Sequence, residues 1–539
     1  TSLIIPEITA YINRVVSDGG TVASSSAANS AYRQLVSAGV IDDVSLLTVA
    51  TGRKAGTLYS VIPDTGAGDF DVTRSGITAI ELNKQGFWQP VAANVPRTNW
   101  IDGKPAILVE EARTNLITYP KSFANSYWTK SRASIEGDAS TAGDELWTGA
   151  TTIDAGWTDN GDGSYACDGT NSADLYQNVG AVAGIIYYVT FEVTAYTSGT
   201  LNALGCGSPT FTYTLNITST GSYSVFVAAS SAPNIGFKST SFTGSIDNIS
   251  VKEVQGFASP FVDAAGDNLL NAYKLAATSA NGYIQLATPA TVTASTTYAN
   301  SIFIKRLTGT GAVNLIDVNG TDRAVTISEE WQRFEYAAAA GTTSGQIGVK
   351  LATSGDEVLI AHAQLEAAST ASSPIGGDEG STQTRNADVI KLTGASALIG
   401  QTEGTIVVDV NINQLLGVVG RVIINIGRGE LVQDLLQIYF TGSASNQLRV
   451  LIAGATSSVV FSKNITSTGQ YKIALVYKSA DNAVFINGSK QTLTLNPAFL
   501  FTETITNITL GDSLNDSINK VVLFETALSD AECITLTTL

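Results

Sequence analysis

The feature that most constrains this sequence is the loss of helical periodicity after about residue 57. From there to the end, short runs rich in Val, Ile, Thr, Tyr and Phe alternate with Gly, Asn, Asp and Ser, as in 187–195, 298–305, 404–410 and 471–477. Such runs between turn residues are typical of β-sandwiches and jelly rolls. At 539 residues the chain is long enough for three to four domains. The sequence therefore predicts a mainly β, multidomain sandwich or jelly-roll protein.

The first 60 residues differ, because their apolar residues recur at helical spacing. Residues 6–18 predict one short amphipathic helix, a second runs from near Ser24 to Gly39, and 44–49 is a third, weaker apolar segment. Short helices bury little area alone. The segment is therefore either a small helical bundle or a part that docks the chain onto something larger, and in the second case its removal should leave a soluble protein.

Charge and composition exclude several classes of function. The 30 basic and 47 acidic residues leave a net charge of -17, which disfavours binding to nucleic acid or anionic lipid. The sequence shows neither a signal peptide nor an uncharged apolar run of about 18 residues, so we predict no Sec export and no membrane insertion. Cys167, Cys206 and Cys533 form neither a disulfide framework nor a zinc motif, and we assign no cofactor.

Three short motifs, followed by two longer regions, resemble segments of tailed-bacteriophage virion proteins. DVTRS at 71–75, ANVPR at 93–97 and LVEEARTNL at 108–116 are similar to a linker that reads TRxS, AANxPR and LLxExxRTNL. FANSYWTK at 123–130 resembles the start of a carbohydrate-binding-module-like jelly roll. The last 150 or so residues, with ALSDAE at 527–532, resemble a concanavalin A-like, laminin-G-like sandwich.

The resemblance also implies how the chain is divided. It suggests a helical virion-docking segment at 1–60 and a linker or small β region at 61–116. An outer jelly roll in two pieces, 117–143 plus 256–375, encloses an inserted jelly roll at 144–255. A lectin-type sandwich follows at 385–539. The outer jelly roll is split because the module that starts near Trp128 continues only at AYKL, 272–275. The strand around Trp128 should then pair with strands beyond residue 265.

No residue pattern indicates catalysis. His362 is the single histidine, lies in an apolar run without a recognisable nucleophile, and is expected in the core. Glucanases that share the lectin-like fold carry paired carboxylates in an E-x-D-x-x-E strand, and this chain has no such pattern. Asp409 stands alone, so we interpret it as a solvent-facing strand residue. We predict a protein that is not an enzyme.

Two groups of residues suit ligands but have simpler explanations. Acidic residues at 154, 159, 162 and 168, and again within 511–516, offer oxygen ligands for calcium, yet turn formation explains them better. Tryptophans stack well on sugar rings, but burial in cores is favoured for each of Trp88, Trp100, Trp128, Trp147 and Trp157. No metal ligand is predicted, and the ligand-binding residues stay unassigned.

Together these observations suggest a structural phage virion protein. The resemblance implies a fibre or spike that contacts capsid, portal or tail proteins, displays β-sandwiches and binds host-surface glycans weakly and multivalently. A homo-oligomer, most simply a trimer, is expected from the usual symmetry of such proteins. Two alternatives stay open: a purely structural decoration or collar protein, and a polysaccharide depolymerase.

Overall fold

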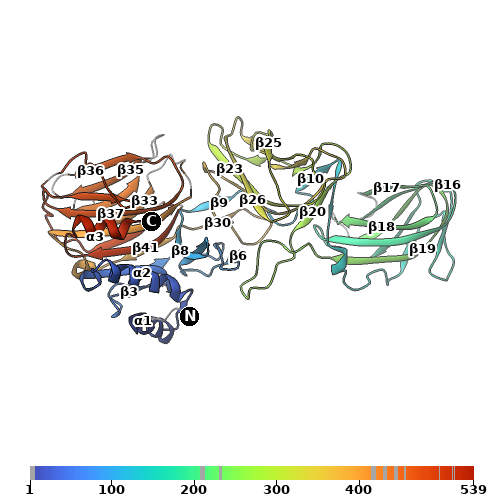
Figure 1. The fold of residues 1–539 in the computed structure, drawn as a ribbon. Coiled ribbons are helices and arrows are strands. Elements are labelled where there is room, and N and C mark those ends of the chain that lie inside the picture. The colour runs from blue at the N-terminus through green and yellow to red at the C-terminus, as the bar shows by residue number, and fades with distance from the viewer. Residues whose placement is uncertain are drawn as a thin grey trace.

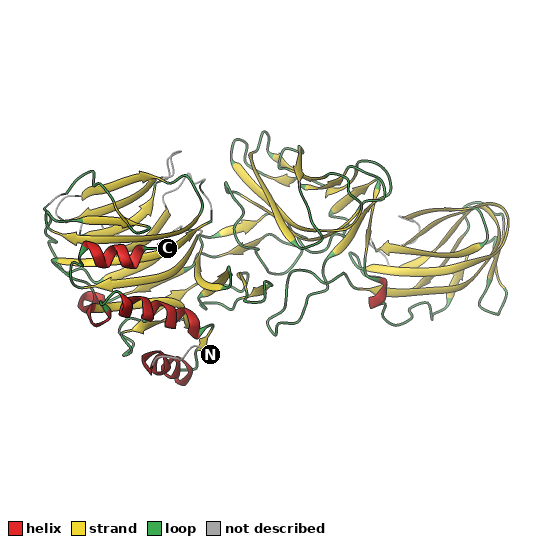
Figure 2. Ribbon diagram, viewed as in Figure 1, coloured by secondary structure: helices red, strands yellow, loops and turns green. Residues whose placement is uncertain are grey.

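The chain forms an elongated row of three β lobes, with helices at one end (Figure 1). The computed structural model describes residues 6–206, 213–229, 233–413, 415, 421–428, 434–441, 447–454, 457–496, 498–512, 514 and 516–539. Strands dominate each lobe, and the α-helices lie near the two termini while a short 3-10 turn lies at the third lobe (Figure 2), so the predicted mainly β, multidomain fold class is confirmed.

The first lobe is a sandwich built from both ends of the chain. Its C-terminal strands are β31 (Val389–Leu392), β32 (Glu403–Ile412), β33 (Arg421–Gly427), β34 (Leu435–Phe440), β35 (Gln447–Ala453), β36 (Ser457–Asn464), β37 (Gly469–Lys478), β38 (Ala483–Ile486), β39 (Ser489–Lys490), β40 (Asn507–Asp512) and β41 (Asp516–Phe524). The N-terminal strands are β1 (Thr21–Val22), β2 (Val44–Lys54), β3 (Thr57–Ile62), β4 (Phe70–Thr73), β7 (Arg97–Ile101) and β8 (Lys104–Val109). All of them are hydrogen-bonded into one continuous sheet that folds over into two layers.

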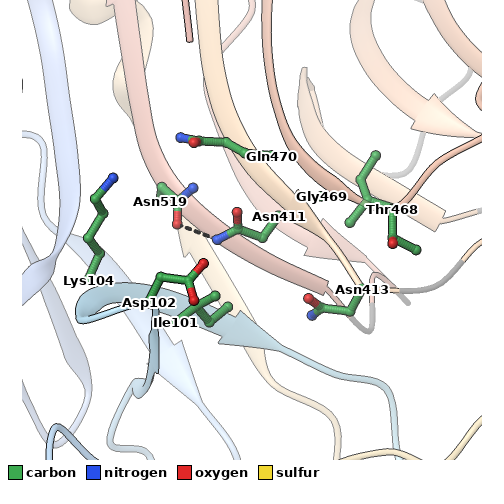
Figure 3. Close-up of a pocket in the computed structure, with 10 residues that line it drawn as sticks. Ile101, Asp102, Lys104, Asn411, Asn413, Thr468, Gly469, Gln470 and Asn519 are labelled. Carbon is green, nitrogen blue, oxygen red and sulfur yellow. Dashed lines mark hydrogen bonds between the residues drawn. The ribbon is translucent and has the colours of Figure 1, made fainter.

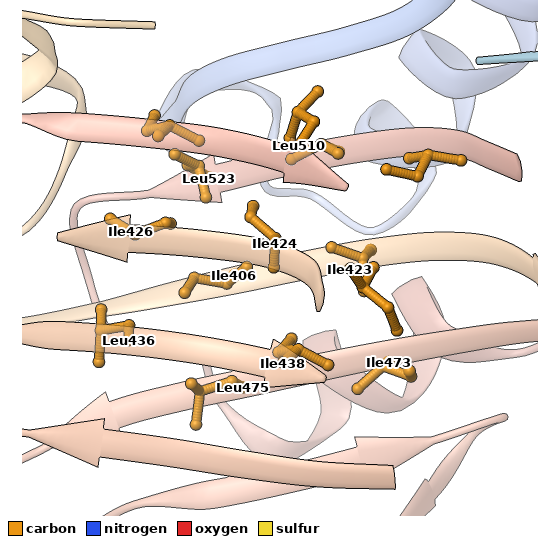
Figure 4. Packing of buried hydrophobic residues seen from close by; sticks show 14 of the residues in the cluster. Ile406, Ile423, Ile424, Ile426, Leu436, Ile438, Ile473, Leu475, Leu510 and Leu523 are labelled. Atoms are coloured by element: carbon orange, nitrogen blue, oxygen red, sulfur yellow. The ribbon is translucent and has the colours of Figure 1, made fainter. Parts of the chain in front are cut away.

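The core of this sandwich follows from strand alternation. Successive side chains of a strand point to opposite faces. Ile406, Val408 and Val410 of β32 therefore point inward, where they meet the apolar side chains of β33, β34 and β40 (Figure 4). The intervening residues of β32, such as Val407 and Asp409, lie on the outer face, which carries both the N-terminal helices and the groove described below.

The N-terminal segment is integrated into the sandwich, which corrects two expectations. The third apolar segment is strand β2 rather than a helix, and it pairs with β41 so that Val44 lies opposite Phe524. Helices α1 (Pro6–Ser17) and α2 (Ser25–Ser37) bury their apolar faces in a cluster that also contains Val407 and Phe485. These helices therefore cover apolar surface of this chain and are not a separate helical bundle. Two short 3-10 turns, at Ile41–Asp43 and Ala395–Leu398, complete the lobe.

A third helix, α3 (Asp530–Thr537), packs on the same outer face. Its N-terminus is closed by a capping box, in which the Ser529 hydroxyl accepts from the backbone N–H of Glu532 and the Glu532 carboxylate accepts from that of Ser529. Such reciprocal capping satisfies two helix-end donors. The S-x-x-E pattern inside ALSDAE therefore marks a helix that the strand-based interpretation of the C-terminus missed.

The middle lobe is the outer jelly roll, with two five-stranded sheets packed face to face. One contains β10 (Trp128–Ser131), β21 (Gly282–Leu286), β24 (Val313–Ile316), β25 (Asp322–Val325) and β28 (Gly348–Leu351). The other contains β11 (Ala133–Glu136), β20 (Tyr273–Ala277), β23 (Thr297–Thr308), β26 (Gln332–Ala339) and β29 (Glu357–Glu366), and β22 (Ala290–Thr291) pairs with β27 (Ser344–Gly345). Trp128 lies opposite Leu286 and Ile135 opposite Leu275, so the predicted pairing beyond residue 265 is confirmed.

The third lobe lies between β11 and β20 in the sequence. Its strands are β12 (Thr151–Ile153), β13 (Trp157–Asp159), β14 (Tyr165–Asp168), β15 (Asp174–Asn178), β16 (Ile186–Cys206), β17 (Tyr213–Ile217), β18 (Gly221–Ala228) and β19 (Asn234–Val254), preceded by a 3-10 turn at Ala139–Thr141. The long strands β16 and β19 pair along their length through several register shifts. Such bulges bend strands, and the resulting lobe has its own core around Phe191 and Phe237.

The inserted lobe shares part of its core with its host. Ile186 and Val254 are buried in the outer jelly roll's cluster, and Phe226 packs against it. Replacing residues 144–255 by a short Gly/Ser linker should therefore leave the outer jelly roll folded but less stable, because these apolar contacts disappear. Thermal unfolding followed by circular dichroism measures this, and an outer jelly roll that no longer unfolds cooperatively would contradict it.

Point variants separate the shared contact from general damage. Ile186→Ala should destabilise the full chain by about 2–5 kcal/mol, since Ile186 is 1% exposed. Val182→Ala, four residues earlier and 58% exposed, should change stability by no more than about 0.5 kcal/mol.

A buried ionic cluster joins the sandwich to the outer jelly roll. We call Arg74, Arg97, Glu110, Arg385 and Asp388 the junction cluster. It lies beside a two-stranded pairing of β9 (Arg113–Asn115) with β30 (Gln383–Arg385) and near the hairpin of β5 (Ile80–Leu82) and β6 (Trp88–Pro90). Three of its members come from the TRxS, AANxPR and LLxExxRTNL motifs, so these motifs hold the junction together.

The charges of the junction cluster are paired with one another in the core. Arg97 donates from Nη1 to Glu110 Oε2 at 2.6 Å and pairs through Nη2 with Asp388. Arg74 donates to Asp388 Oδ1 at 2.8 Å, and Arg385 lies 3.2 Å from Glu110 Oε2. Burial raises the pKa of the Glu110 carboxyl, but Arg385 and Arg97 outweigh burial and hold that pKa below its usual value.

Candidate functional site

The single histidine is a core residue. His362 is 3% exposed, its Nε2 lies 3.1 Å from the carbonyl oxygen of Ile375, and its ring stacks on Phe261. Burial lowers the pKa of the imidazole to about 3, and Arg333 adds to this effect. A ring that is neutral at physiological pH and enclosed by Phe261 and backbone is a packing residue, as the sequence indicated.

The acidic residues of the inserted lobe shape turns. The side chain of Asp159 accepts from the N–H of Gly161 at 2.8 Å, that of Asp162 from Ser164 at 3.0 Å, and that of Asp168 from Thr170 at 2.9 Å. Asp154 accepts from the N–H of Asp174 at 3.2 Å. Bonds from a side chain to the backbone two residues on are the mechanism by which Asp favours turns. The second acidic stretch, 511–516, lies partly outside the described residues.

The tryptophans occupy two kinds of position. Trp128 and Trp157 are buried at 2% and 5% exposure, as predicted. Trp88 and Trp147 are half-buried and pack against hydrophobic clusters. Trp100 is also half-buried, with the Lys84 ammonium 5.4 Å from its ring centroid. The burial predicted for all five tryptophans is thus only partial for Trp88, Trp100 and Trp147.

Asp409 is the one residue whose environment differs most from the prediction. It is 6% exposed rather than solvent-facing. Gln470 donates from Nε2 to both carboxylate oxygens, at 2.8 and 3.0 Å, and Asn519 donates from Nδ2 to Oδ1 at 2.8 Å. Asn411 in turn donates to Asn519 Oδ1 at 2.8 Å. The outer face of the sheet therefore carries a connected row of amide and carboxylate groups.

Pairing between strands distant in the sequence assembles this row. On β32 and β37, Asn411 lies opposite Gln470, and Asp409 opposite Lys472. On β41 the register shifts between the partners of Asp409 and Val410, so Asn519 is an extra, bulged residue. A bulge re-aims a side chain, and here the bulged side chain donates to Asp409. On its other edge β41 pairs with β2 up to Lys520 and with β8 from Ile518, so the change of partner strand also falls at Asn519.

The β7–β8 hairpin forms one wall of a groove over these residues. Its turn residues Asp102 and Gly103 both have positive φ, 48° and 74°, as a tight two-residue hairpin turn requires. The hairpin brings Ile101, Asp102 and Lys104 against the ends of β32, β37 and β41 (Figure 3). The resulting pocket has a volume of about 320 Å³, and its lining also includes Asn411, Asn413, Thr468, Gly469, Gln470 and Asn519.

A second pocket, of about 350 Å³, continues toward α2 and shares Lys104, Gln470 and Asn519 with the first. We call the two together the outer-face groove. The second pocket is bounded by Gln34 of α2 and by Lys472 and Lys520. Within the part of the chain that the structure describes, no group of three His, Cys, Asp or Glu residues is placed to hold a metal ion.

Sequence reasoning missed the groove because its residues come from separate segments. Asn411, Gln470 and Asn519 were not singled out, and only Asp409 was considered. One signal was present: 404–410 and 471–477 were correctly predicted as strands, and each carries one charged residue, Asp409 or Lys472, on the face that bears the site. Polar residues in alternation with a buried apolar set mark the outer face of a sheet. The pattern reveals the face but not that a hairpin and a helix enclose it.

The fold and the groove define a multidomain β-sandwich protein with a polar surface site, and comparisons add little to that. No family model matches this chain, and no curated protein matches it. Among the described residues, no helix is long and apolar enough to cross a membrane.

Solved structures match about a quarter of the chain. The CBM40 module of the Ruminococcus gnavus IT-sialidase, bound to α2,3 sialyllactose, is 18% identical over 27% of this chain and 87% of that chain, with a TM-score of 0.23. The leech intramolecular trans-sialidase is 19% identical, and the match covers 27% of this chain and 24% of that one, with a TM-score of 0.23. The binding domain of botulinum neurotoxin DC is 12% identical, and the match covers 28% of this chain and 39% of that one, with a TM-score of 0.24. These scores are too low to identify a ligand or a reaction.

Proposed function

We propose that this chain is a non-catalytic glycan-binding protein and that the outer-face groove is its binding site. The connected row of Asp409, Gln470, Asn519 and Asn411 carries the proposal. Amides both donate and accept, and a carboxylate accepts at two oxygens, so the row suits the adjacent hydroxyls of a sugar ring. The groove is lined mainly by such groups and holds no aromatic side chain among its lining residues, which favours weak binding at each site.

The virion role is part of the same proposal. It is supported by the TRxS, AANxPR and LLxExxRTNL resemblance, which is typical of phage appendages, and the expected homo-oligomer stays a prediction. Weak sites repeated on a fibre or spike gain effective concentration from one another, so adhesion requires no single tight site. Catalysis is disfavoured because both oxygens of Asp409 already accept hydrogen bonds from amides.

A glycan array tests the proposal. We expect the immobilised full chain to retain host-surface oligosaccharides, and Asn411→Ala and Asn413→Ala to weaken retention by about three- to tenfold each, the effect of losing one hydrogen bond. Gln85→Ala, in the exposed turn between β5 and β6, is the matched control and should bind normally.

Three results would contradict the assignment. Retention unchanged in both groove variants would place the site elsewhere. Release of new reducing ends from a bound polysaccharide would favour a depolymerase, and absence of any glycan binding together with strong binding to capsids would favour a decoration protein.

A further inference from the structure

The outer-face groove has more basic than acidic side chains, although the chain as a whole is acidic. The protein carries 47 acidic and 30 basic residues, yet the pocket beside α2 is lined by Lys104, Lys472 and Lys520 against a single carboxylate, that of Asp409. A concave site lined by one sign of charge concentrates ligands of the opposite sign. The first pocket adds the Asp102 carboxylate, so the excess of positive charge lies in the pocket beside α2.

Lys520 is the most unusual of the three lysines. It is 5% exposed, and its ammonium donates to Gln34 Oε1 of α2 at 2.5 Å. Among the described residues no carboxylate oxygen lies within 4.0 Å of it. Asp409 on the neighbouring strand attracts the ammonium without bonding to it directly. An ammonium has three donors, and burying its charge without a directly bonded counter-charge is costly. A negative group in the pocket would supply that counter-charge.

The other two lysines differ in how they are held. Lys472 donates to the carbonyl oxygen of Thr538 at 2.6 Å in an exposed hydrogen bond. Lys104 is exposed on the hairpin, and it lines both pockets. The amide end of the groove, around Asn411 and Asn413, adjoins the lysine end through Gln470 and Asn519, which line both pockets.

We propose that the outer-face groove binds acidic glycans, with a sugar carboxylate at the end formed by Lys104, Lys472 and Lys520 and neutral hydroxyls at the amide end. This inference rests on the proposed glycan-binding function and specifies its ligand class. The negative sugar group neutralises the buried Lys520 ammonium, while Asp409 is held by its two amide donors.

The pH dependence provides a signature of Lys520. The groups that face it are Asp409 on β32, Lys472 on β37, Lys104 at the start of β8 and the neutral Gln34 on α2. Burial lowers the pKa of Lys520 to about 8. Its ammonium is therefore charged below that pH and loses the charge above it, so the affinity for an acidic glycan should fall as pH rises from 7 to 9.

The experiment compares hexuronic acid oligosaccharides (oligogalacturonates, oligomannuronates and oligoguluronates) with neutral oligosaccharides of the same linkage and length. We expect the full chain to prefer the acidic members by about tenfold, the value of one charge-assisted contact. Lys520→Met and Lys104→Met should each reduce that preference about tenfold, and Lys520→Met should abolish the fall between pH 7 and 9. Lys463→Met, an exposed lysine on β36 that changes the net charge equally, is the control.

The outcomes separate the two proposals. Equal or better binding of the neutral oligosaccharides overturns the acidic-ligand inference and leaves glycan binding standing. An acidic preference unchanged in both lysine variants also overturns it. Failure to bind either kind of oligosaccharide overturns both proposals. Because Met fills the space of the Lys520 stem without a charge to bury, loss of fold is not expected, and circular dichroism checks it.

Discussion

Replacing Arg97 by Ala should destabilise the protein by about 3–5 kcal/mol, among the largest effects of any single substitution in this chain. Arg97 is fully buried and bonds both Glu110 and Asp388. Removing the guanidinium leaves two carboxylates that are 4% and 5% exposed with a reduced counter-charge. A buried ion that loses its partner keeps its desolvation cost, and this makes the loss larger than that of a surface pair.

Urea unfolding and the melting temperature measure this effect. We expect a fall of roughly 10 °C in the transition of the sandwich. Lys350→Ala, which breaks the exposed pair with Asp322, is the control and should cost no more than about 1 kcal/mol. An Arg97→Ala protein as stable as this control would mean that the junction cluster does not hold the lobes together.

The same cluster sets the response to acid. Burial raises the pKa values of Glu110 and Asp388, but the arginines outweigh it and the net shift of both is downward. Groups with lowered pKa values stabilise the fold above their unfolded pKa of about 4 and lose that contribution as pH falls through the folded value. The difference in stability between the native protein and Arg97→Ala should therefore shrink at low pH.

A chain that starts at Gly68 should be insoluble or unfolded in its C-terminal sandwich, which reverses the expectation from sequence that it stays soluble. The truncation removes β2, which pairs with β41 from Val44 to Val49, and exposes an edge of the sheet. It also removes α1 and α2, whose buried side chains form part of the apolar cluster on the outer face that contains Val407, Phe485 and Val522. Exposed edges and large apolar patches drive aggregation.

Expression solubility and size-exclusion chromatography measure the outcome. Two neighbouring substitutions test the cause in the full chain. Leu35→Ala removes a fully buried side chain of α2 and should cost about 2–5 kcal/mol, whereas Val36→Ala, at 50% exposure, should cost at most about 0.5 kcal/mol. A soluble, cooperatively folded chain from Gly68 onward would show that the helices are a removable appendage, and virion docking by this segment would regain its support.

Local pattern was sufficient for the strands, and the nested order of the jelly rolls came from the family resemblance. Residues 404–410 and 471–477 are strands because alternation and β-forming residues are local properties of the sequence. The pairing of Trp128 with Leu286 was inferable because the module beginning at Trp128 is completed only after an intervening module. The helix after Ser529 was also readable in principle, since a capping box is a four-residue signal.

The candidate site could not be predicted from short stretches of sequence, because its residues come from segments far apart in the chain. Asp409 was misread as solvent-facing because its burial comes from Gln470 and Asn519, 61 and 110 residues away in sequence. The bulge that aims Asn519 at Asp409 arises from register between β32 and β41, and the hairpin wall comes from a segment some 300 residues earlier. The sequence by itself therefore determined which segments are strands and which faces are apolar. Only the tertiary structure decided which polar residues meet, because long-range pairing, not local propensity, places them side by side.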